Sequence, residues 1–211
     1  FDFNFRRRLL AEIKSEIIFM KDKIVGAFLA LIFGGLVTLS YAFRRQLQTA
    51  GFPLDPYFFS LFAIPILLLI LGKISSAQMG FKIGKPLYGL FFVFLLPGIL
   101  FLRFYFMGKP FVLTEGATLL VIGSIAEEFF FRGYLQSQFE KSFNNTGLSF
   151  FLTNLLFMLV HFVKGYSLLP LSMVGLIGLY FSFARDKSGG DSLIYPAGAH
   201  SLYNLVASSI K

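Results

Sequence analysis

Long apolar runs recur along the whole chain, and they constrain the fold more than any other feature of the sequence. A helix needs roughly 20 mainly apolar residues to span a bilayer. Seven segments approach this length, and they are Ile24 to Phe43, Tyr57 to Leu71, Pro86 to Phe106, Glu115 to Gln138, Gly147 to Val163, Leu168 to Ala184 and Leu193 to Ile210. The sequence therefore predicts an all-α, multi-pass transmembrane bundle of about seven spanning helices. We expect Pro65 to interrupt the second segment.

The composition excludes an ordinary soluble domain. Hydrophobic residues make up 56% of the chain and charged residues 14%, with a mean hydropathy of +0.73, whereas about a quarter of a soluble chain is usually charged. So few charges cannot cover so much apolar surface in water, and a bilayer removes this need. The absence of cysteine excludes disulfides and thiolate chemistry.

Residues 1–23 differ from the rest of the chain because they mix basic and apolar residues at helical spacing. The apolar positions include Leu9, Leu10, Ile13 and Ile17, and they alternate with arginines and lysines. This pattern is typical of an amphipathic helix on a membrane surface. We therefore predict a surface helix over residues 1–23 and a single transmembrane domain over residues 24–211, whose motif-bearing core covers about residues 115–211.

The net charge of +8 comes from Lys and Arg residues whose positions along the chain predict the orientation in the membrane. The Lys and Arg residues lie between apolar segments and form no single stripe, so we expect the lipid bilayer, and no nucleic acid, as a partner. With a cytoplasmic N-terminus, twice as many of them lie in cytoplasmic segments as in outer ones. The positive-inside rule therefore predicts that the N-terminus is cytoplasmic. We expect a multi-pass integral protein of a bacterial or archaeal cell membrane.

The fourth apolar segment carries three charged residues, Glu127, Glu128 and Arg132. A charge at the centre of a spanning helix costs about 2.5 to 3.5 kcal/mol on insertion scales. Glu128 and Arg132 are four residues apart and can pair along one helix face. Glu127 lies about 100° around the helix from Glu128 and needs another partner or a water-filled cavity.

Two further apolar segments each carry one of the two histidines of the chain. His161 follows Phe157 by one turn in the fifth segment, and His200 precedes Asn204 by one turn in the seventh. Straight helices would leave Glu127 near mid-membrane, His161 towards the outer side and His200 towards the inner side. A common site therefore requires a strongly tilted helix, a broken helix or a different number of spans.

These residues suffice for hydrolysis of a carbonyl compound without a covalent intermediate. A carboxylate such as Glu127 can take a proton from water, and a neutral histidine can hold that water. His200 and Asn204 can donate hydrogen bonds to a developing oxyanion. A zinc site built from Glu127, His161 and His200 is an alternative, since three protein ligands and a water make a catalytic zinc site. No serine motif of the G-x-S-x-G kind occurs.

Three motifs resemble those of the CAAX protease and bacteriocin-processing family, also called the abortive-infection family. Glu127-Glu128-x-x-x-Arg132 resembles the first motif, Phe157-x-x-x-His161 the second and His200-x-x-x-Asn204 the last. They occur in the family's order on separate apolar segments, over about Glu115 to Lys211. The first half of the chain is similar to the family only in being hydrophobic.

The resemblance implies an α-helical intramembrane endopeptidase similar to type II CAAX prenyl proteases. It implies that Glu127 and His161 activate water, that His200 and Asn204 stabilise the oxyanion, and that Glu128, Arg132 and Phe157 support the site. It favours a glutamate peptidase with no cofactor over a zinc enzyme. The implied substrate is a peptide or protein, with lipidated and membrane-embedded substrates both open.

Two other functions stay open on the sequence alone. The first is a non-catalytic membrane protein that binds a partner or confers immunity, in which the motifs form a structural polar network. The second is a proton-coupled transporter with a carboxylate–histidine relay.

Overall fold

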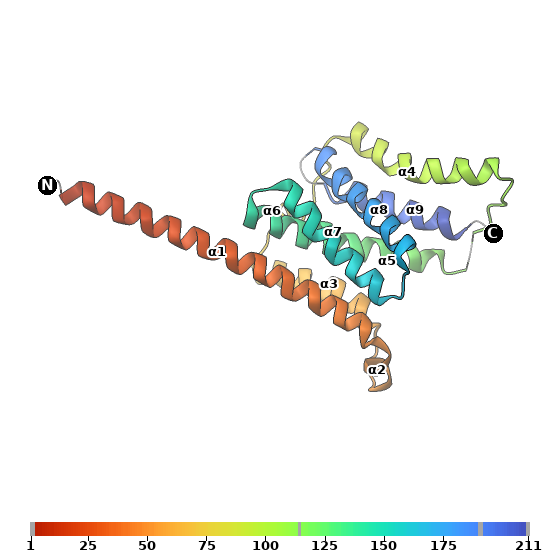
Figure 1. The fold of residues 1–211 in the computed structure, drawn as a ribbon, viewed down its shortest axis with the longest axis horizontal. Coiled ribbons are helices and arrows are strands. Elements are labelled where there is room, and N and C mark those ends of the chain that lie inside the picture. Colours follow the sequence, from red (N-terminus) through yellow and green to blue (C-terminus); the bar gives the residue numbers. More distant parts are fainter. Residues whose placement is uncertain (1–2, 114, 190–191, 210–211) are drawn as a thin grey trace.

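The computed structural model describes residues 3–113, 115–189 and 192–209, and these residues form helices and loops without a β-strand (Figure 1). In chain order the elements are α1 (Phe3–Ala42), α2 (Arg44–Thr49), α3 (Pro56–Ile70), α4 (Pro86–Phe106), α5 (Ala117–Glu128), the π-helix η1 (Phe129–Gln136), α6 (Ser137–Phe143), α7 (Thr146–Val163), α8 (Leu168–Lys187) and α9 (Ile194–Ser208). The predicted all-α fold is confirmed, and each predicted apolar segment overlaps one helix or one run of helices.

Four of the described helices are long and apolar enough to cross a membrane. They are Glu12–Ala42 within α1, Pro86–Phe106, Thr146–Val163 and Leu168–Lys187. The apolar helix α3 is shorter. Many large apolar side chains are exposed, among them Leu87 (82%) and Phe106 (81%) on α4. Such a surface is stable against lipid, so the helices form a membrane bundle.

The predicted surface segment and the first predicted span belong to one continuous helix, α1. Figure 1 shows that the first half of α1 extends beyond the other helices. The side chains of Leu9, Leu10, Ile13 and Ile17 are exposed there. The proposed boundary after residue 23 therefore falls inside a helix, and attachment of this segment to a membrane surface stays a prediction.

Proline and short polar residues set several helix ends. Asp55 caps α3 by accepting hydrogen bonds from the amides of Tyr57 (2.9 Å) and Phe58 (3.3 Å), and Pro56 occupies the first turn, where its missing N–H is not needed. Asn145 caps α7 through the amide of Leu148 (2.9 Å). Pro65 does not interrupt α3 as we expected, because the helix continues through it to Ile70.

The interior of the bundle is built around η1. Phe130, Phe131 and Leu135 of η1 are fully buried, and α1, α3 and α7 all pack against this element. The preceding helix α5 packs along α9. The junction of α5 and η1, which carries the charged residues, therefore lies at the centre of the protein.

Candidate active site

A change of helix type marks the centre of the site. Glu127 and Glu128 are the last two residues of the α-helix α5, and the next eight residues form η1. A π-helix bonds each amide to a carbonyl five residues back and is frequent at functional sites. Both glutamates are buried, with 8% of Glu127 and none of Glu128 exposed. Such burial requires partners for both carboxylates.

Glu128 has two basic partners. Its Oε1 accepts hydrogen bonds from Nη1 of Arg132 (2.9 Å) and Nδ1 of His200 (2.8 Å). The first contact is the pairing that the four-residue spacing predicted. The second joins the first motif to the last. Glu128 therefore neutralises Arg132 and orients the His200 ring.

Arg132 is fully buried and is held from three further directions. Its Nη2 donates to the carbonyl oxygen of Gly178 on α8 (2.7 Å). Its guanidinium carbon lies 4.5 Å from the ring centroid of Phe157 and 5.5 Å from that of Phe181. Cation–π contacts of this kind stabilise a desolvated arginine. Arg132 thus connects η1, α7 and α8 behind the site.

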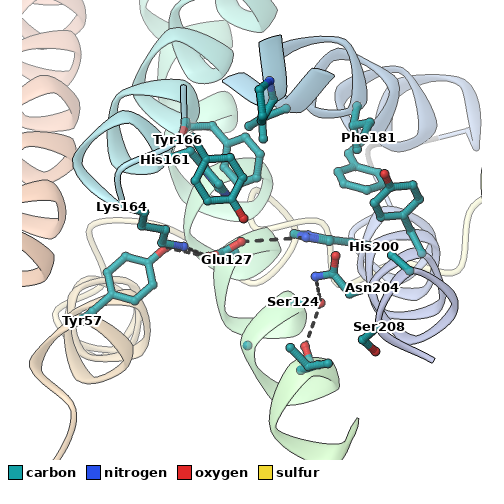
Figure 2. A pocket seen from close by; sticks show the side chains of 18 of the residues that line it. Tyr57, Ser124, Glu127, His161, Lys164, Tyr166, Phe181, His200, Asn204 and Ser208 are labelled. Carbon is teal, nitrogen blue, oxygen red and sulfur yellow. Dashed lines mark hydrogen bonds and ion pairs between the residues drawn. The ribbon is translucent and has the colours of Figure 1, made fainter. Parts of the chain in front are cut away.

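Glu127 has different partners (Figure 2). Its Oε1 accepts hydrogen bonds from the hydroxyl of Tyr57 (2.7 Å) and the ammonium group of Lys164 (2.8 Å). Its Oε2 lies 3.8 Å from Nε2 of His200. Figure 2 shows Tyr57 and Lys164 on one side of this carboxylate and His200 on the other. Oε1 is thus fixed by two donors, and Oε2 faces the histidine.

The partners of the histidines assign their tautomers. Nδ1 of His161 lies 2.9 Å from the carbonyl oxygen of Phe157, and Nδ1 of His200 lies 2.8 Å from the Glu128 carboxylate. Both oxygens only accept hydrogen bonds, so each Nδ1 carries a proton. The Nε2 atom of each neutral ring is then a proton acceptor. His200 donates from Nε2 only when it is also protonated there.

Aromatic rings fix the planes of both histidines. The ring of Phe181 stacks on His200 with centroids 4.6 Å apart and an interplanar angle of 24°. Phe157 packs against His161 at 4.5 Å, and Tyr166 meets the same ring edge-on at 5.2 Å. Packed rings cannot rotate freely, so each Nε2 keeps one direction.

Asn204 is oriented by a short chain of hydrogen bonds. Its Nδ2 donates to Oγ of Ser124 (2.9 Å), and that hydroxyl donates to the carbonyl oxygen of Leu120 (2.8 Å). A side-chain amide has two N–H donors, so this contact leaves one of them for another acceptor. Gly123, one residue before Ser124, also lines the space beside it.

The structure places the four predicted catalytic residues around one cavity of about 690 Å³. Its lining includes Glu127, His161, His200 and Asn204, together with Phe157. The residues meet although they come from α5, α7 and α9, because α5 packs along α9 and α7 packs on η1. Glu128 and Arg132 do not line the cavity and lie behind it.

The residues that a zinc site would use lie beside a cation, the ammonium group of Lys164. Within the described ranges, no group of three His, Asp or Glu side chains is placed to hold a metal ion. Oε1 of Glu127 already accepts two hydrogen bonds, and the ammonium group of Lys164 beside it repels a second cation. The remaining acceptors are Oε2 of Glu127 and the two histidine Nε2 atoms.

Sequence reasoning missed Tyr57, Lys164 and Phe181, and it did not predict the hydrogen bond between Ser124 and Asn204. Lys164 follows His161 by three residues and shares that face of the helix, but it stands at the end of an apolar segment, where a lysine is typical of a membrane-flanking loop. Tyr57 is 70 residues from Glu127, and no local spacing connects them. The need of Glu127 for a partner was the available signal, and it did not identify these two.

Comparison with known proteins concerns the second half of the chain. Residues 109–206 match the family model described as type II CAAX prenyl endopeptidase Rce1-like. No curated protein and no solved structure matches the chain. The matched segment contains all three motifs and runs from before α5 into α9. The match and the three motifs make the second half of this chain similar to the CAAX protease and bacteriocin-processing family.

Proposed function

We propose that this protein is an intramembrane endopeptidase that hydrolyses a peptide bond with water activated by Glu127 and His161. The observation that carries this proposal is the convergence of a buried carboxylate, two oriented histidines and an oriented amide on one cavity (Figure 2). The family match over residues 109–206 supports a peptidase with a peptide or protein substrate in the membrane. Similarity to type II CAAX prenyl endopeptidases over residues 109–206 supports a substrate of the CAAX prenyl type.

Water activation begins at Oε2 of Glu127. Tyr57 and Lys164 stabilise the ionised carboxylate through Oε1, which leaves Oε2 to accept a proton. Nε2 of His161 is a hydrogen-bond acceptor in the neutral ring and orients the same water. As Glu127 takes one proton, the water oxygen attacks the carbonyl carbon of the substrate.

Asn204 and His200 stabilise the resulting oxyanion. Asn204 keeps one N–H donor after its contact with Ser124, and His200 supplies a second donor when it is protonated between Glu127 and Glu128. Preorganised donors of this kind lower the barrier because they need no reorganisation during the reaction. The C–N bond then breaks, and the leaving amine takes the proton that Glu127 removed from water.

The test is cleavage of a lipidated CAAX-type peptide by the purified protein in detergent, run in water enriched in ¹⁸O. We expect two product peptides, with one ¹⁸O atom in the new carboxyl group. A metal chelator should leave the rate unchanged, and the purified protein should contain less than one zinc per chain. Failure to cleave any peptide contradicts the proposal, whereas chelator-sensitive cleavage with one bound zinc replaces the glutamate mechanism by the metal mechanism.

A further inference from the structure

One end of the cavity is positively charged and contains a cation that the proposed hydrolysis does not use. Arg44, the first residue of α2, is half-buried and lines the cavity. Its guanidinium carbon lies 4.6 Å from the ring centroid of Tyr41, and the Nζ atom of Lys164 lies 5.5 Å from the same centroid. Both cations therefore gather around one tyrosine.

The charges in the cavity do not balance. Its charged lining residues are Arg44, Lys164 and Glu127. Lys164 and Glu127 neutralise each other at 2.8 Å. In the part of the chain that the structure describes, no carboxylate forms an ion pair with Arg44. The remaining positive charge favours an anionic group at this end.

We propose that Arg44 binds the C-terminal carboxylate of the peptide substrate. This inference rests on the proposed peptidase function. A peptide of any sequence carries this anion unless its C-terminus is blocked. Most of the other residues that line the cavity are apolar or aromatic and can contact apolar side chains of a peptide. A planar guanidinium matches a carboxylate with two parallel hydrogen bonds. The tyrosine ring holds the guanidinium in place before the peptide arrives.

The distance from Arg44 to Glu127 limits where the peptide is cut. Three contacts connect the two side chains: Glu127 to Lys164 (2.8 Å), Lys164 to the Tyr41 ring (5.5 Å) and that ring to Arg44 (4.6 Å). Their lengths set an upper limit on the distance between Arg44 and Glu127. An extended peptide advances about 3.3 Å per residue. A substrate held by its carboxylate at Arg44 therefore presents a bond to Glu127 within about four residues of its C-terminus.

The experiment compares two forms of one peptide, a CAAX-type peptide with a fluorescent N-terminal label and either a free C-terminal carboxylate or a carboxamide. Binding to the detergent-solubilised protein is measured by fluorescence anisotropy before hydrolysis proceeds. We expect the amide to bind about tenfold more weakly than the acid, as loss of one charge-assisted pair predicts. Arg44→Gln should weaken binding of the acid about tenfold and leave the amide unchanged.

The matched control is Arg45→Gln, since Arg45 is the next residue, is exposed and does not line the cavity. This variant should bind both peptides as the unaltered protein does. Equal binding of acid and amide overturns the proposal, and so does an equal loss of both in Arg44→Gln. Displacement of the acid by phosphatidylglycerol but not phosphatidylcholine in the micelle, with no preference for acid over amide, assigns Arg44 to a lipid headgroup instead.

The peptidase function and the carboxylate site fail separately. Selective binding of the acid without hydrolysis contradicts the peptidase while keeping the role of Arg44 in recognition. Hydrolysis of acid and amide with equal affinity keeps the peptidase and removes the role of Arg44.

Discussion

Glu127 has two carboxylate oxygens in different surroundings, and this difference assigns their roles in the proposed mechanism. Oε1 is held by Tyr57 and Lys164, while Oε2 faces His200 and the cavity. Lys164 also lies 3.4 Å from the Tyr57 hydroxyl, so the three side chains form one hydrogen-bonded group. We infer that Lys164 is a positioning residue, because it touches the base and not the reacting bond.

Replacing Lys164 by methionine tests this positioning role. The carboxylate loses its charge partner and one of two anchors, and we expect kcat to fall about 10- to 100-fold with KM little changed, since small displacements of a catalytic group have effects of this size. Lys164→Arg should restore part of kcat. The control is Lys141→Met at an exposed position outside the cavity. Equal kcat in Lys164→Met and the unaltered protein removes Lys164 from the mechanism.

The buried pair behind the site makes a prediction about stability. Arg132→Met leaves the fully buried Glu128 with His200 as its remaining partner among the described residues. Removing one member of a buried ion pair typically costs about 3–5 kcal/mol. Thermal unfolding in detergent should show a clear loss of stability. Lys187→Met, which removes the exposed partner of Asp186, should change the free energy of unfolding by less than about 1 kcal/mol. Similar unfolding temperatures for the two variants would contradict this account.

At this scale the sequence predicted the contacts made within a motif and missed most of those made between helices. The spacing of Glu128 and Arg132 predicted their ion pair, because neighbours four residues apart meet on any helix. The partners Tyr57 and Lys164 of Glu127 depend on how α3 and α7 pack around η1. Such packing leaves no regular spacing in the sequence.

Among the elements, the close approach of α7 and α8 holds Arg132 in place. Gly178 on α8 faces Asn154 of α7 and Arg132 of η1. A methyl group at this position would overlap the Asn154 side-chain oxygen and lie 3.0 Å from Nη2 of Arg132. The hydrogen bond from Arg132 to the Gly178 carbonyl requires this same proximity.

Gly178→Ala should therefore separate the two helices and disturb the site. We expect a lower unfolding temperature in detergent together with loss of peptide cleavage, because small residues permit such helix contacts in membranes. Gly98→Ala is the matched control, since Gly98 lies inside helix α4 with no neighbouring atom within 4 Å of the added carbon. Unchanged stability and activity in Gly178→Ala would show that close contact of α8 with α7 is not needed for stability or cleavage.

The helices themselves were predictable, but their internal irregularities were not. The predicted range Pro86 to Phe106 coincides with α4, and the predicted fifth segment begins one residue after α7 does. Apolar length and proline position determine these ends. The change from α-helix to π-helix after Glu128 shifts hydrogen bonds by one residue and leaves no signal in apolar periodicity.

For the whole molecule, one question is which side of the membrane the Arg44 end of the cavity faces. Arg44 lies two residues after Ala42, the last residue of α1. A cytoplasmic N-terminus, as the charge distribution predicts, places this end of α1 on the outer side when α1 crosses the membrane once. The opposite orientation places it in the cytoplasm.

Cysteine labelling decides the orientation, because the chain has no cysteine of its own. Gln48→Cys and Lys141→Cys each introduce one thiol at an exposed position. With a membrane-impermeant maleimide on spheroplasts of an expression host, we expect labelling at position 48 at once and at position 141 only after permeabilisation. The reverse pattern would contradict the predicted orientation and place Arg44 on the cytoplasmic side.

The central claim is that Glu127 is the base that activates water, and single-turnover cleavage by Glu127→Gln tests it most directly. The amide keeps the size of the side chain and one oxygen that accepts hydrogen bonds, but it cannot accept the proton, so we predict a fall in rate of about 10² to 10⁴ with unchanged peptide binding. The control Glu115→Gln alters an exposed glutamate outside the cavity and should keep the full rate. Normal cleavage by Glu127→Gln would contradict the account.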